Sequence, residues 1–297
     1  MLPIEVDVNR CKICNTDELE IFMHTAKCRK CGVLLYYPYP QPATLETKND
    51  ERSIATYKDF YREYHTLSSR LNHENFTAMY LFTIEHPERI LDRIRILDYG
   101  AGTGQFTLIC KSFIPWSDIY SVDINDFALL QEYDTSTKQI KWKDFENDTM
   151  KFDFIFLNDV FEHLHDCEKV LKTLKDKLDP NGKIFIATPK QFWIHPVLKF
   201  LSKNLYGKLL TGTVSISHLQ IWSRKSFFYL INQSNLAAEK YSEISQFTME
   251  PDEYLKNMGI KNRIIIILGK LFYRLAGSIA RNKIMCVLVN KGPNSND

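Results

Sequence analysis

Four cysteines near the start of the chain have the spacing of a metal site. Cys11 and Cys14 form one C-x2-C pair, and Cys28 and Cys31 form a second pair thirteen residues further on. Two such pairs suit tetrahedral Zn²⁺, because each pair places two thiolates on one tight turn. Four thiolates leave no open coordination position, so we expect a structural zinc ion rather than a catalytic one. Two structural disulfides are the alternative, which is less favoured because no export signal precedes the pairs.

A glycine-rich turn follows one apolar segment of the chain, and an acidic residue ends the next one. The segment that ends in Asp98 runs into Gly100, Gly102 and Gly104, and Asp123 follows nineteen residues later. Glycines at a strand-to-helix turn let a ligand approach the backbone, and the later carboxylate can bind two ribose hydroxyls. Dinucleotide sites read G-x-G-x-x-G, whereas this turn reads D-x-G-x-G-x-G. The pattern therefore predicts a nucleoside-containing ligand without a pyrophosphate.

The elements that must position these residues follow the pattern of a doubly wound α/β sheet. From Arg93 onward, short apolar runs alternate with helical segments, as expected when helices cover both faces of a mostly parallel sheet. The predicted strands are residues 94–99, 118–123, 139–142, 152–158, 183–188, 236–244 and 284–290. A composition of 44% hydrophobic and 13% aromatic residues excludes disordered, collagenous and disulfide-stapled chains.

The sequence divides into a small N-terminal unit, a connector and one large domain. Residues 1–40 are predicted to form a zinc ribbon that ends in a strand-like run and a stiff, proline-rich connection. Residues 41–92 are polar and helical in character, and we expect them to form a connector or lid. Residues 93–292 are predicted to form the α/β domain, with insertions at 191–217 and 252–281.

Four parts of the large domain resemble the successive motifs of class I S-adenosylmethionine-dependent methyltransferases. They are Asp98–Gly104, Asp123, Phe152–Leu164 and Leu178–Pro189. The opening Cys-x2-Cys…Cys-x2-Cys-Gly is similar to the zinc ribbon of many bacterial members, among them sugar C-methyltransferases and enzymes that tailor surface polysaccharides. The resemblance covers residues 11–190 well and the rest more loosely. It implies a Rossmann-like sheet of seven strands in which the last strand runs antiparallel.

The resemblance also implies a set of contacts with S-adenosylmethionine. The residues expected to bind it are Asp98, Gly100, Ala101, Gly102, Gly104, Asp123, Ile124, Asp144, Asn158 and Asp159. Asp98 would fix the ammonium group, Asp123 the ribose and Asp144 the adenine amino group. Asn158 and Asp159 would lie next to the sulfonium. For Asp144, a solvated position in a charged stretch is an equal alternative.

Glu162 and His163 follow the fourth strand of the large domain and are candidates for acid–base chemistry. A hydroxyl or activated carbon must lose a proton as it attacks the methyl group, and a histidine can accept that proton near neutral pH. We expect His163 to open the helix beyond the strand, where open α/β sheets bind ligands. Because the resembling sugar C-methyltransferases use this pair, His163 is the predicted base and Glu162 its neighbour. Two alternatives stand beside it: a pocket wall without base catalysis, and a divalent metal shared with Asp159.

The second half of the chain is basic. Residues 1–179 carry a formal net charge of −8 and residues 180–297 a net charge of +10, so we expect an anionic group to meet the second half. His218 precedes a Leu-Gln-Ile-Trp-Ser run that resembles the acceptor-side segment of many relatives. It is the second candidate catalytic residue, with a hydrogen-bonded core histidine as the alternative.

A helix predicted within residues 261–281 is basic and amphipathic. At about 100° per residue, its cations share one face, with apolar residues on the other side. These cations are Arg263, Lys270, Arg274 and Arg281. One interpretation is a lid whose cations extend past the apolar surface to water; the other is contact with an anionic membrane surface or a lipid-phosphate substrate.

These patterns favour methyl transfer from S-adenosylmethionine to a small-molecule or glycan acceptor, in particular a nucleotide- or lipid-linked sugar of surface-polysaccharide biosynthesis. An RNA base methyltransferase is the first alternative. The mixed charge of the ribbon and the lack of an Asn-Pro-Pro-Tyr base clamp argue against it. A non-catalytic binding module is the second, against which stand the intact glycine turn and Asp123. We expect a cytoplasmic chain, peripheral at the inner membrane face through residues 261–281, and the patterns predict no particular oligomeric state.

Overall fold

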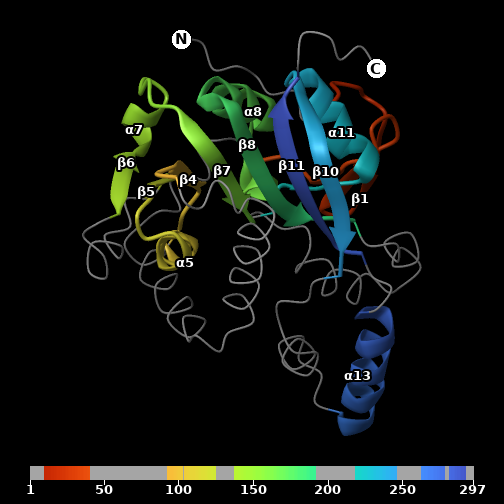
Figure 1. Cartoon of the computed structure of the whole chain (residues 1–297). Helices are drawn as coiled ribbons and strands as arrows, with labels where there is room; N and C mark the ends of the chain where they lie inside the picture. The colour runs from red at the N-terminus through yellow and green to blue at the C-terminus, as the bar shows by residue number, and fades with distance from the viewer. Residues whose placement is uncertain are drawn as a thin grey trace.

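The structure, a computed structural model, describes seven stretches of the chain. They are residues 10–40, 92–102, 104–124, 137–191, 218–245, 262–277 and 281–291. Apart from Asp92 and Gln191, the predicted connector at 41–92 and the predicted insertion at 191–217 lie outside the described residues. The described stretches form two sheets with helices packed against them (Figure 1).

The larger sheet has seven strands in the order β10-β11-β8-β7-β4-β5-β6. The strands are β4 (Arg95–Tyr99), β5 (Asp118–Asp123), β6 (Lys138–Lys141), β7 (Phe152–Asn158), β8 (Leu178–Pro189), β10 (Leu236–Ile244) and β11 (Lys283–Asn290). β4 to β8 pair in parallel, whereas β11 runs antiparallel between β8 and β10. The predicted fold class, a seven-stranded α/β sheet with an antiparallel last strand, is confirmed.

Helices cover both faces of this sheet. Successive side chains of a strand point to opposite faces, so two neighbouring residues of β4 show what packs on each face. On β4, Ile96 packs with apolar residues of α5 (Gln105–Phe113). Its neighbour Leu97 belongs instead to the cluster that includes residues of α8 (Cys167–Asp176) and α11 (Arg224–Gln233). The sheet is therefore doubly wound, as the sequence pattern predicts.

Strand β8 begins at Leu178 rather than at the predicted residue 183. The reason is a bulge: Phe152 of β7 pairs with Leu178, but Phe154 pairs with Lys183. The turn-like residues between these pairs therefore belong to the strand. Gly182 fits there because a Cβ at this position would come within 2.8 Å of the Phe152 carbonyl oxygen.

The smaller sheet joins the N-terminal segment to the large domain. Its strands are, in order, β1 (Leu19–Phe22), β2 (Thr25–Cys28), β3 (Leu34–Tyr36) and β9 (Gln220–Ile221), and all neighbours are antiparallel. Leu34 pairs with Ile221, and Leu35 pairs with Gln220. The sheet of the ribbon is therefore completed by a strand of the large domain.

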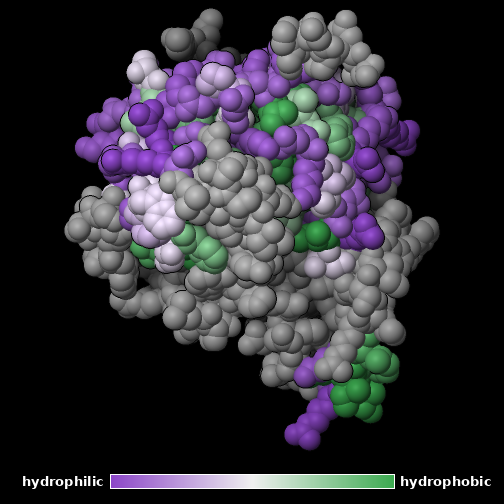
Figure 2. All heavy atoms as spheres, viewed as in Figure 1, coloured by the Kyte–Doolittle hydropathy of each residue, from purple (hydrophilic) through white to green (hydrophobic). Residues whose placement is uncertain are grey.

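Three further elements lie outside the sheets. A short helix α7 (Trp142–Phe145) follows β6, the 3₁₀ turn η1 (Phe161–His163) follows β7, and α13 (Arg263–Gly277) lies between β10 and β11 in the chain. On the face shown in Figure 2 the described surface is mostly hydrophilic with smaller hydrophobic areas, and hydrophobic side chains also gather at α13. None of the described helices is long and apolar enough to cross a membrane.

Candidate active site

The carboxyl ends of the parallel strands bring the predicted cofactor residues together. The glycine turn follows β4, Asp123 ends β5 and Asn158 ends β7, and β5 and β7 flank β4 in the sheet. The Gly102 N–H donates to Asp123 Oδ2 at 2.8 Å, and the Ala101 N–H donates to the Val122 carbonyl at 3.1 Å. Open α/β sheets bind ligands at this edge. The turn and the acidic residue therefore form one continuous surface there.

The three glycines of the turn all have left-handed backbone, but their surroundings differ. φ is 77° at Gly100, 53° at Gly102 and 79° at Gly104, a region that favours glycine. A Cβ on Gly100 would lie 2.6 Å from Val160 Cγ2, so this glycine lets the turn pack against the segment after β7. A Cβ on Gly102 would meet nothing within 4 Å. The space over Gly102 can therefore accept a ligand against the backbone.

Asp98 is buried beneath the turn. Its Oδ2 accepts a hydrogen bond from Thr107 Oγ1 at 2.6 Å, which ties β4 to α5. Burial raises the pKa of Asp98 to about 7, against the lowering effect of the Thr107 hydroxyl. A cation bound nearby would favour the ionised carboxylate, which is the behaviour expected of a group that faces an ammonium.

An apolar platform lies beside Asp123. Asp123 pairs in register with Lys141, so Ile124 and Trp142, which follow these two residues, leave neighbouring strands at the same edge. Both side chains are exposed, and the Trp142 ring lies 5.7 Å from that of Tyr99. A flat aromatic side chain of this kind can stack on a base. The predicted adenine ligand, Asp144, is exposed on α7 two residues further on.

Trp142 is not among the residues predicted from the sequence to bind the cofactor. The available signal was a large aromatic residue within a charged stretch at the end of a predicted strand.

Asn158 and Asp159, at the end of β7, have different environments. Asn158 Nδ2 is buried and has no hydrogen-bond partner among the described residues. Asp159 has a left-handed backbone with φ of 51°, a conformation that is costly for a residue with a Cβ and is typical of functional sites. Its Oδ2 pairs with Lys283 Nζ at 2.8 Å. Asn158 is therefore an amide donor left for a ligand, whereas Asp159 already has a cationic partner that sequence reasoning missed.

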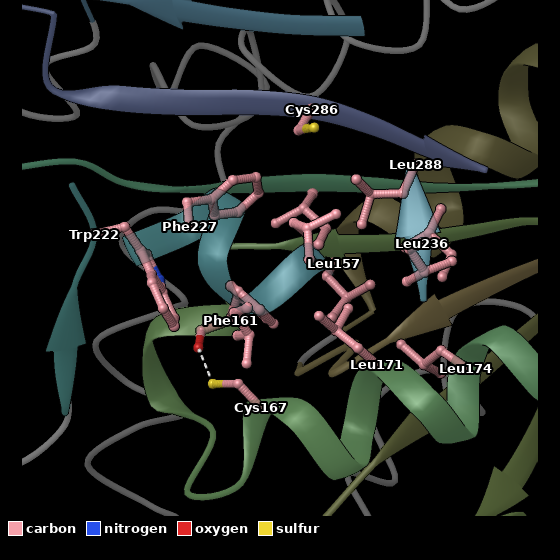
Figure 3. Packing of buried hydrophobic residues seen from close by; sticks show 14 of the residues in the cluster. Leu157, Phe161, Cys167, Leu171, Leu174, Trp222, Phe227, Leu236, Cys286 and Leu288 are labelled. Atoms are coloured by element: carbon pink, nitrogen blue, oxygen red, sulfur yellow. Dashed lines mark hydrogen bonds between the residues drawn. The ribbon is translucent and has the colours of Figure 1, made fainter. Parts of the chain in front are cut away.

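Glu162 and His163 lie in the 3₁₀ turn η1, and the expectation that His163 opens the following helix is wrong. Helix α8 begins at Cys167, where Asp166 caps it by accepting from the Lys169 N–H. The turn is instead anchored by its first residue, Phe161, whose fully buried ring stacks on that of Trp222 (Figure 3). The centroids of the two rings are 4.9 Å apart. This apolar anchor, rather than a helix, positions the candidate base.

Glu162 and the two candidate histidines form one cluster. Glu162 is fully buried; its Oε2 accepts from Thr188 Oγ1 at 2.9 Å, and its Oε1 has no hydrogen-bond partner among the described residues. His163 Nε2 lies 3.8 Å from Glu162 Oε1, and the His163 and His218 rings are 4.8 Å apart. Burial raises the pKa of Glu162 to about 7, and the nearby His163 acts against this rise. Glu162 can therefore hold a proton near neutral pH, next to the half-exposed His163.

The donor atoms of this cluster also lie within 4.8 Å of one another, so the three residues could hold a metal ion. Asp159, which the metal alternative included, pairs with Lys283 instead. The structure thus brings His218, and not Asp159, to Glu162 and His163.

The four N-terminal cysteines form a second cluster with metal-site geometry. Cys11 and Cys31 Sγ are 3.7 Å apart, Cys14 and Cys28 Sγ are 3.5 Å apart, and all four are buried free thiols within 4.8 Å of one another. A tetrahedral ion with Zn–S bonds of about 2.3 Å requires sulfur atoms roughly 3.8 Å apart. Gly32, with φ of 81°, turns the chain after the last ligand. The cluster therefore fits a structural zinc ion.

Strand β9 connects the ribbon to the Glu162 turn. Tyr39 Oη, at the end of the ribbon, donates to Gln220 Oε1 at 2.8 Å. Gln220 Nε2 donates in turn to the carbonyls of Phe161 at 3.1 Å and Leu164 at 2.7 Å. The Leu219 N–H donates to the Glu162 carbonyl at 2.9 Å. These contacts were not foreseen from the sequence, and they hold the segment that follows His218 against the Glu162 turn.

Comparison with known proteins identifies the class. A sequence model of the family described as methyltransferase domain matches residues 71–241, which is more than half of the chain. The chain therefore belongs to this methyltransferase family, and its seven-stranded sheet is that of the class I S-adenosylmethionine-dependent members.

One curated relative is a malonyl-[acyl-carrier protein] O-methyltransferase from Calditerrivibrio nitroreducens. It is 29% identical over 94 residues, a match that covers 31% of this chain and 37% of the relative. The chain thus matches little more than a third of that relative's length.

Two solved structures share the fold. The plantazolicin methyltransferase BamL, solved with a triazolic desmethylPZN analogue and SAH, superposes with a TM-score of 0.53 at 13% identity, over 84% of this chain and 94% of that one. Coclaurine N-methyltransferase, bound to N-methylheliamine and SAH, superposes with a TM-score of 0.51 at 13% identity, over 76% and 73% of the two chains.

Proposed function

We propose that this chain transfers the methyl group of S-adenosylmethionine to a small-molecule or glycan acceptor that carries phosphate, such as a nucleotide- or lipid-linked sugar. One observation carries the proposal: the open space over Gly102 adjoins Asp123, at the edge of the sheet where the neighbouring strand β7 ends in Asn158 and continues into the Glu162 turn. A cofactor surface and a proton-accepting cluster thus adjoin one another.

The chain offers a distinct group to each part of the cofactor, which supplies an electrophilic methyl group when bound. The backbone at Gly100–Gly104 would receive the methionine part above the buried Asp98. Asp123 would accept the ribose hydroxyls, as expected for an acidic residue at the end of the second strand. Trp142 and Asp144 would flank the adenine, the first by stacking and the second by accepting from its amino group.

His163 would accept the proton that the acceptor loses. Its side chain is 40% exposed, so an acceptor can reach it, whereas Glu162 behind it is shielded from water. A carboxylate 3.8 Å away stabilises the imidazolium that forms, and the low local dielectric strengthens this interaction. His218, in ring contact with His163, would hold the imidazole in place from the other side.

An anionic acceptor is supported by the charge of the second half of the chain. Residues 180–297, which carry a net charge of +10, supply His218 and Lys283 at this edge. The curated relative is named for a malonyl-[acyl-carrier protein], which is an anionic acceptor of another kind. Phosphate-bearing sugars and malonyl-acyl carrier protein should therefore both be tested as acceptors.

We also propose that the four cysteines hold one structural Zn²⁺. Support comes from the sulfur–sulfur distances of 3.5 and 3.7 Å and from the burial of all four thiols. The ion would stabilise the small sheet, which has little apolar core of its own.

Calorimetric titration of S-adenosylmethionine tests the cofactor site. Asp123→Ala should weaken binding by at least about tenfold, because a charge-assisted acceptor of the ribose hydroxyls is lost. Asp176→Ala, an exposed acid at the end of α8, is the matched control and should bind like the wild type. NADH should not bind. Equal affinity of Asp123→Ala and Asp176→Ala would refute the assignment.

Transfer of tritium from labelled S-adenosylmethionine tests the acceptor. Nucleotide sugars, lipid-linked glycans, malonyl-acyl carrier protein and RNA are supplied separately, and label is expected in the sugar fractions. His163→Gln should lower kcat by about 10² or more while the affinity for S-adenosylmethionine is retained. Label confined to malonyl-acyl carrier protein or to RNA would replace the proposed acceptor, and undiminished kcat in His163→Gln would remove the base.

A further inference from the structure

Helix α13 carries an apolar face that the described protein leaves in water. Ile264, Ile267, Leu268 and Leu271 are each between 56% and 69% exposed. Their spacing is i, i+3, i+4, i+7, so at about 100° per residue they fall within an arc of roughly 100°. Figure 2 shows them as one hydrophobic group at the lower edge of the molecule. We call these four side chains the apolar face of α13.

Cations border this face on one side. On the same helical arithmetic, Arg263 and Lys270 lie within roughly 60° of the edge of the apolar face, and both are exposed. Arg274 falls on the same line of the helix. No acidic residue occurs between residues 254 and 296, so the charged residues in this part of the sequence are all basic. The helix therefore offers aliphatic side chains flanked by positive charge.

The helix is attached to the edge of the sheet that carries the candidate site. β10 ends at Ile244, which pairs with Lys283 at the start of β11, and Lys283 also pairs with Pro189 at the end of β8. The segment that contains α13 therefore leaves and rejoins the sheet at the carboxyl end of β8. Lys283 there reaches Asp159 of the candidate site. In Figure 1, α13 lies beyond this end of β10, away from the rest of the sheet.

We propose that the apolar face of α13 binds the surface of a bilayer that contains anionic lipids. Its 15 residues span about 22 Å, less than the roughly 30 Å of a hydrocarbon core, so the helix would lie in the interface rather than cross it. Aliphatic side chains enter the boundary between headgroups and acyl chains, and bordering cations contact anionic headgroups. Nucleic acid would leave the aliphatic side chains unburied, and the same helix of a second copy would bring no acidic residue to the cations.

Binding in this orientation turns the candidate site toward the membrane. Because α13 extends from the carboxyl edge of the strands, a lipid-linked acceptor could present its headgroup to the Glu162 turn without leaving the bilayer. The docking itself rests on α13 alone, and it would hold even if the proposed acceptor were wrong.

Co-flotation with vesicles tests the proposal. The full chain should float with vesicles of phosphatidylcholine and phosphatidylglycerol and remain at the bottom with phosphatidylcholine alone. Leu268→Glu combined with Leu271→Glu should lower the partition coefficient at least about tenfold, since two apolar side chains are lost from the face. Arg263→Glu combined with Lys270→Glu should lower it by about 25-fold or more, at about fivefold per cation. Raising the salt concentration should weaken wild-type binding.

Matched variants separate the face from general surface effects. Ile21→Glu replaces an equally bulky exposed residue on β1, and Lys172→Glu combined with Lys225→Glu makes the same charge change on α8 and α11. Both should float like the wild type, and every variant should bind S-adenosylmethionine with wild-type affinity. The proposal is overturned if wild-type protein does not float with anionic vesicles, or if the α13 variants float equally well. It is also overturned if light scattering shows a dimer that Leu268→Glu converts to a monomer, because the face then joins two copies.

Discussion

Two buried carboxyl groups dominate the electrostatics of the site. Burial raises the pKa of both Asp98 and Glu162 to about 7, but their partners differ. Each accepts a hydrogen bond from a threonine hydroxyl, but Glu162 also faces a histidine that is open to solvent. At the scale of single residues, the first is suited to a cationic group of a ligand and the second to the exchange of a proton.

Glu162 should make the stability of the fold depend on pH. An acid whose pKa is raised on folding contributes full stability below its unfolded value near 4.5, and that contribution is lost as pH rises through 7. At pH 8, Glu162→Gln should therefore have a free energy of unfolding, measured with urea, up to about 3 kcal/mol higher than that of the wild type. The difference should disappear at pH 5. Glu168→Gln, a partly exposed control on α8, should show no such trend. Parallel pH profiles for Glu162→Gln and the wild type would contradict this.

The glycines of the turn should separate folding from binding. Both Gly100→Ala and Gly102→Ala place a Cβ on left-handed backbone, at a cost of about 1 kcal/mol each. Gly100→Ala additionally pushes the new methyl group into Val160, so it should lose at least about 2 kcal/mol more in urea unfolding.

Gly102→Ala should instead keep most of its stability and bind S-adenosylmethionine about tenfold or more weakly, because the methyl group occupies the ligand space. Calorimetry and urea unfolding of the two variants, side by side, make this comparison. Equal effects of the two substitutions on both measurements would show that Gly102 does not face the cofactor.

At the scale of elements, β9 connects the ribbon that carries the cysteine cluster to the turn that carries the candidate base. It is paired to β3 on the ribbon side, and through Gln220 and Leu219 it is bonded to the turn that carries Glu162. Loss of the metal should consequently affect more than the first forty residues.

Elemental analysis should find one zinc ion per chain, and none in Cys11→Ser combined with Cys14→Ser. Removal of the metal should raise hydrogen exchange in β1–β3 and, with them, in residues 161–164 and 219–222, while β4 and β5 keep their protection. The affinity for S-adenosylmethionine should change little. If hydrogen exchange rises only within residues 10–40, the ribbon does not support the site. If elemental analysis finds a second zinc ion that is lost in His218→Ala, the cluster of Glu162, His163 and His218 is a metal site instead.

At the scale of the whole molecule, local patterns predicted the sheet well. The predicted strands at 94–99, 118–123, 152–158, 183–188 and 284–290 are apolar runs whose side chains are mostly buried in the sheet. The predicted strands at 139–142 and 236–244 correspond to the two edge strands, β6 and β10, whose side chains are mostly not buried. The cysteine spacing likewise encodes a local turn. The start of α8 could also have been located, because Asp166 is a typical N-cap residue before an amphipathic stretch.

What escaped prediction depends on contacts between distant segments. Neither periodicity nor spacing encodes the pair of Lys283 with Asp159, the bond from Thr188 to Glu162, or the pairing of β3 with β9. Each partner is unremarkable in its own stretch of sequence, and only the folded sheet brings the two together. The candidate cofactor residues could be proposed from the sequence because they occupy fixed positions at strand ends, whereas the partners that support them in the structure could not.

A shortened chain that begins at residue 41 should bind its cofactor but lose the acceptor side. Without β1–β3, Leu219 and Ile221, both fully buried, would be exposed to water, whereas the glycine turn and Asp123 keep their neighbours. We expect affinity for S-adenosylmethionine within about threefold of the full chain, increased binding of a hydrophobic dye, and an unfolding midpoint lower by several degrees. Identical dye binding and midpoint in the two chains would contradict this expectation.

The shared small sheet also constrains how such a chain could be recombined. A ribbon exchanged between two relatives would arrive with a β3 edge shaped for a different β9, and the mismatch would fall at Gln220, under the turn that carries the candidate base. Successful chimaeras should therefore exchange residues 10–40 together with residues 218–226, although the two segments lie far apart in the sequence. The part of this protein that can be exchanged between relatives is therefore a pair of distant segments rather than an independent N-terminal domain.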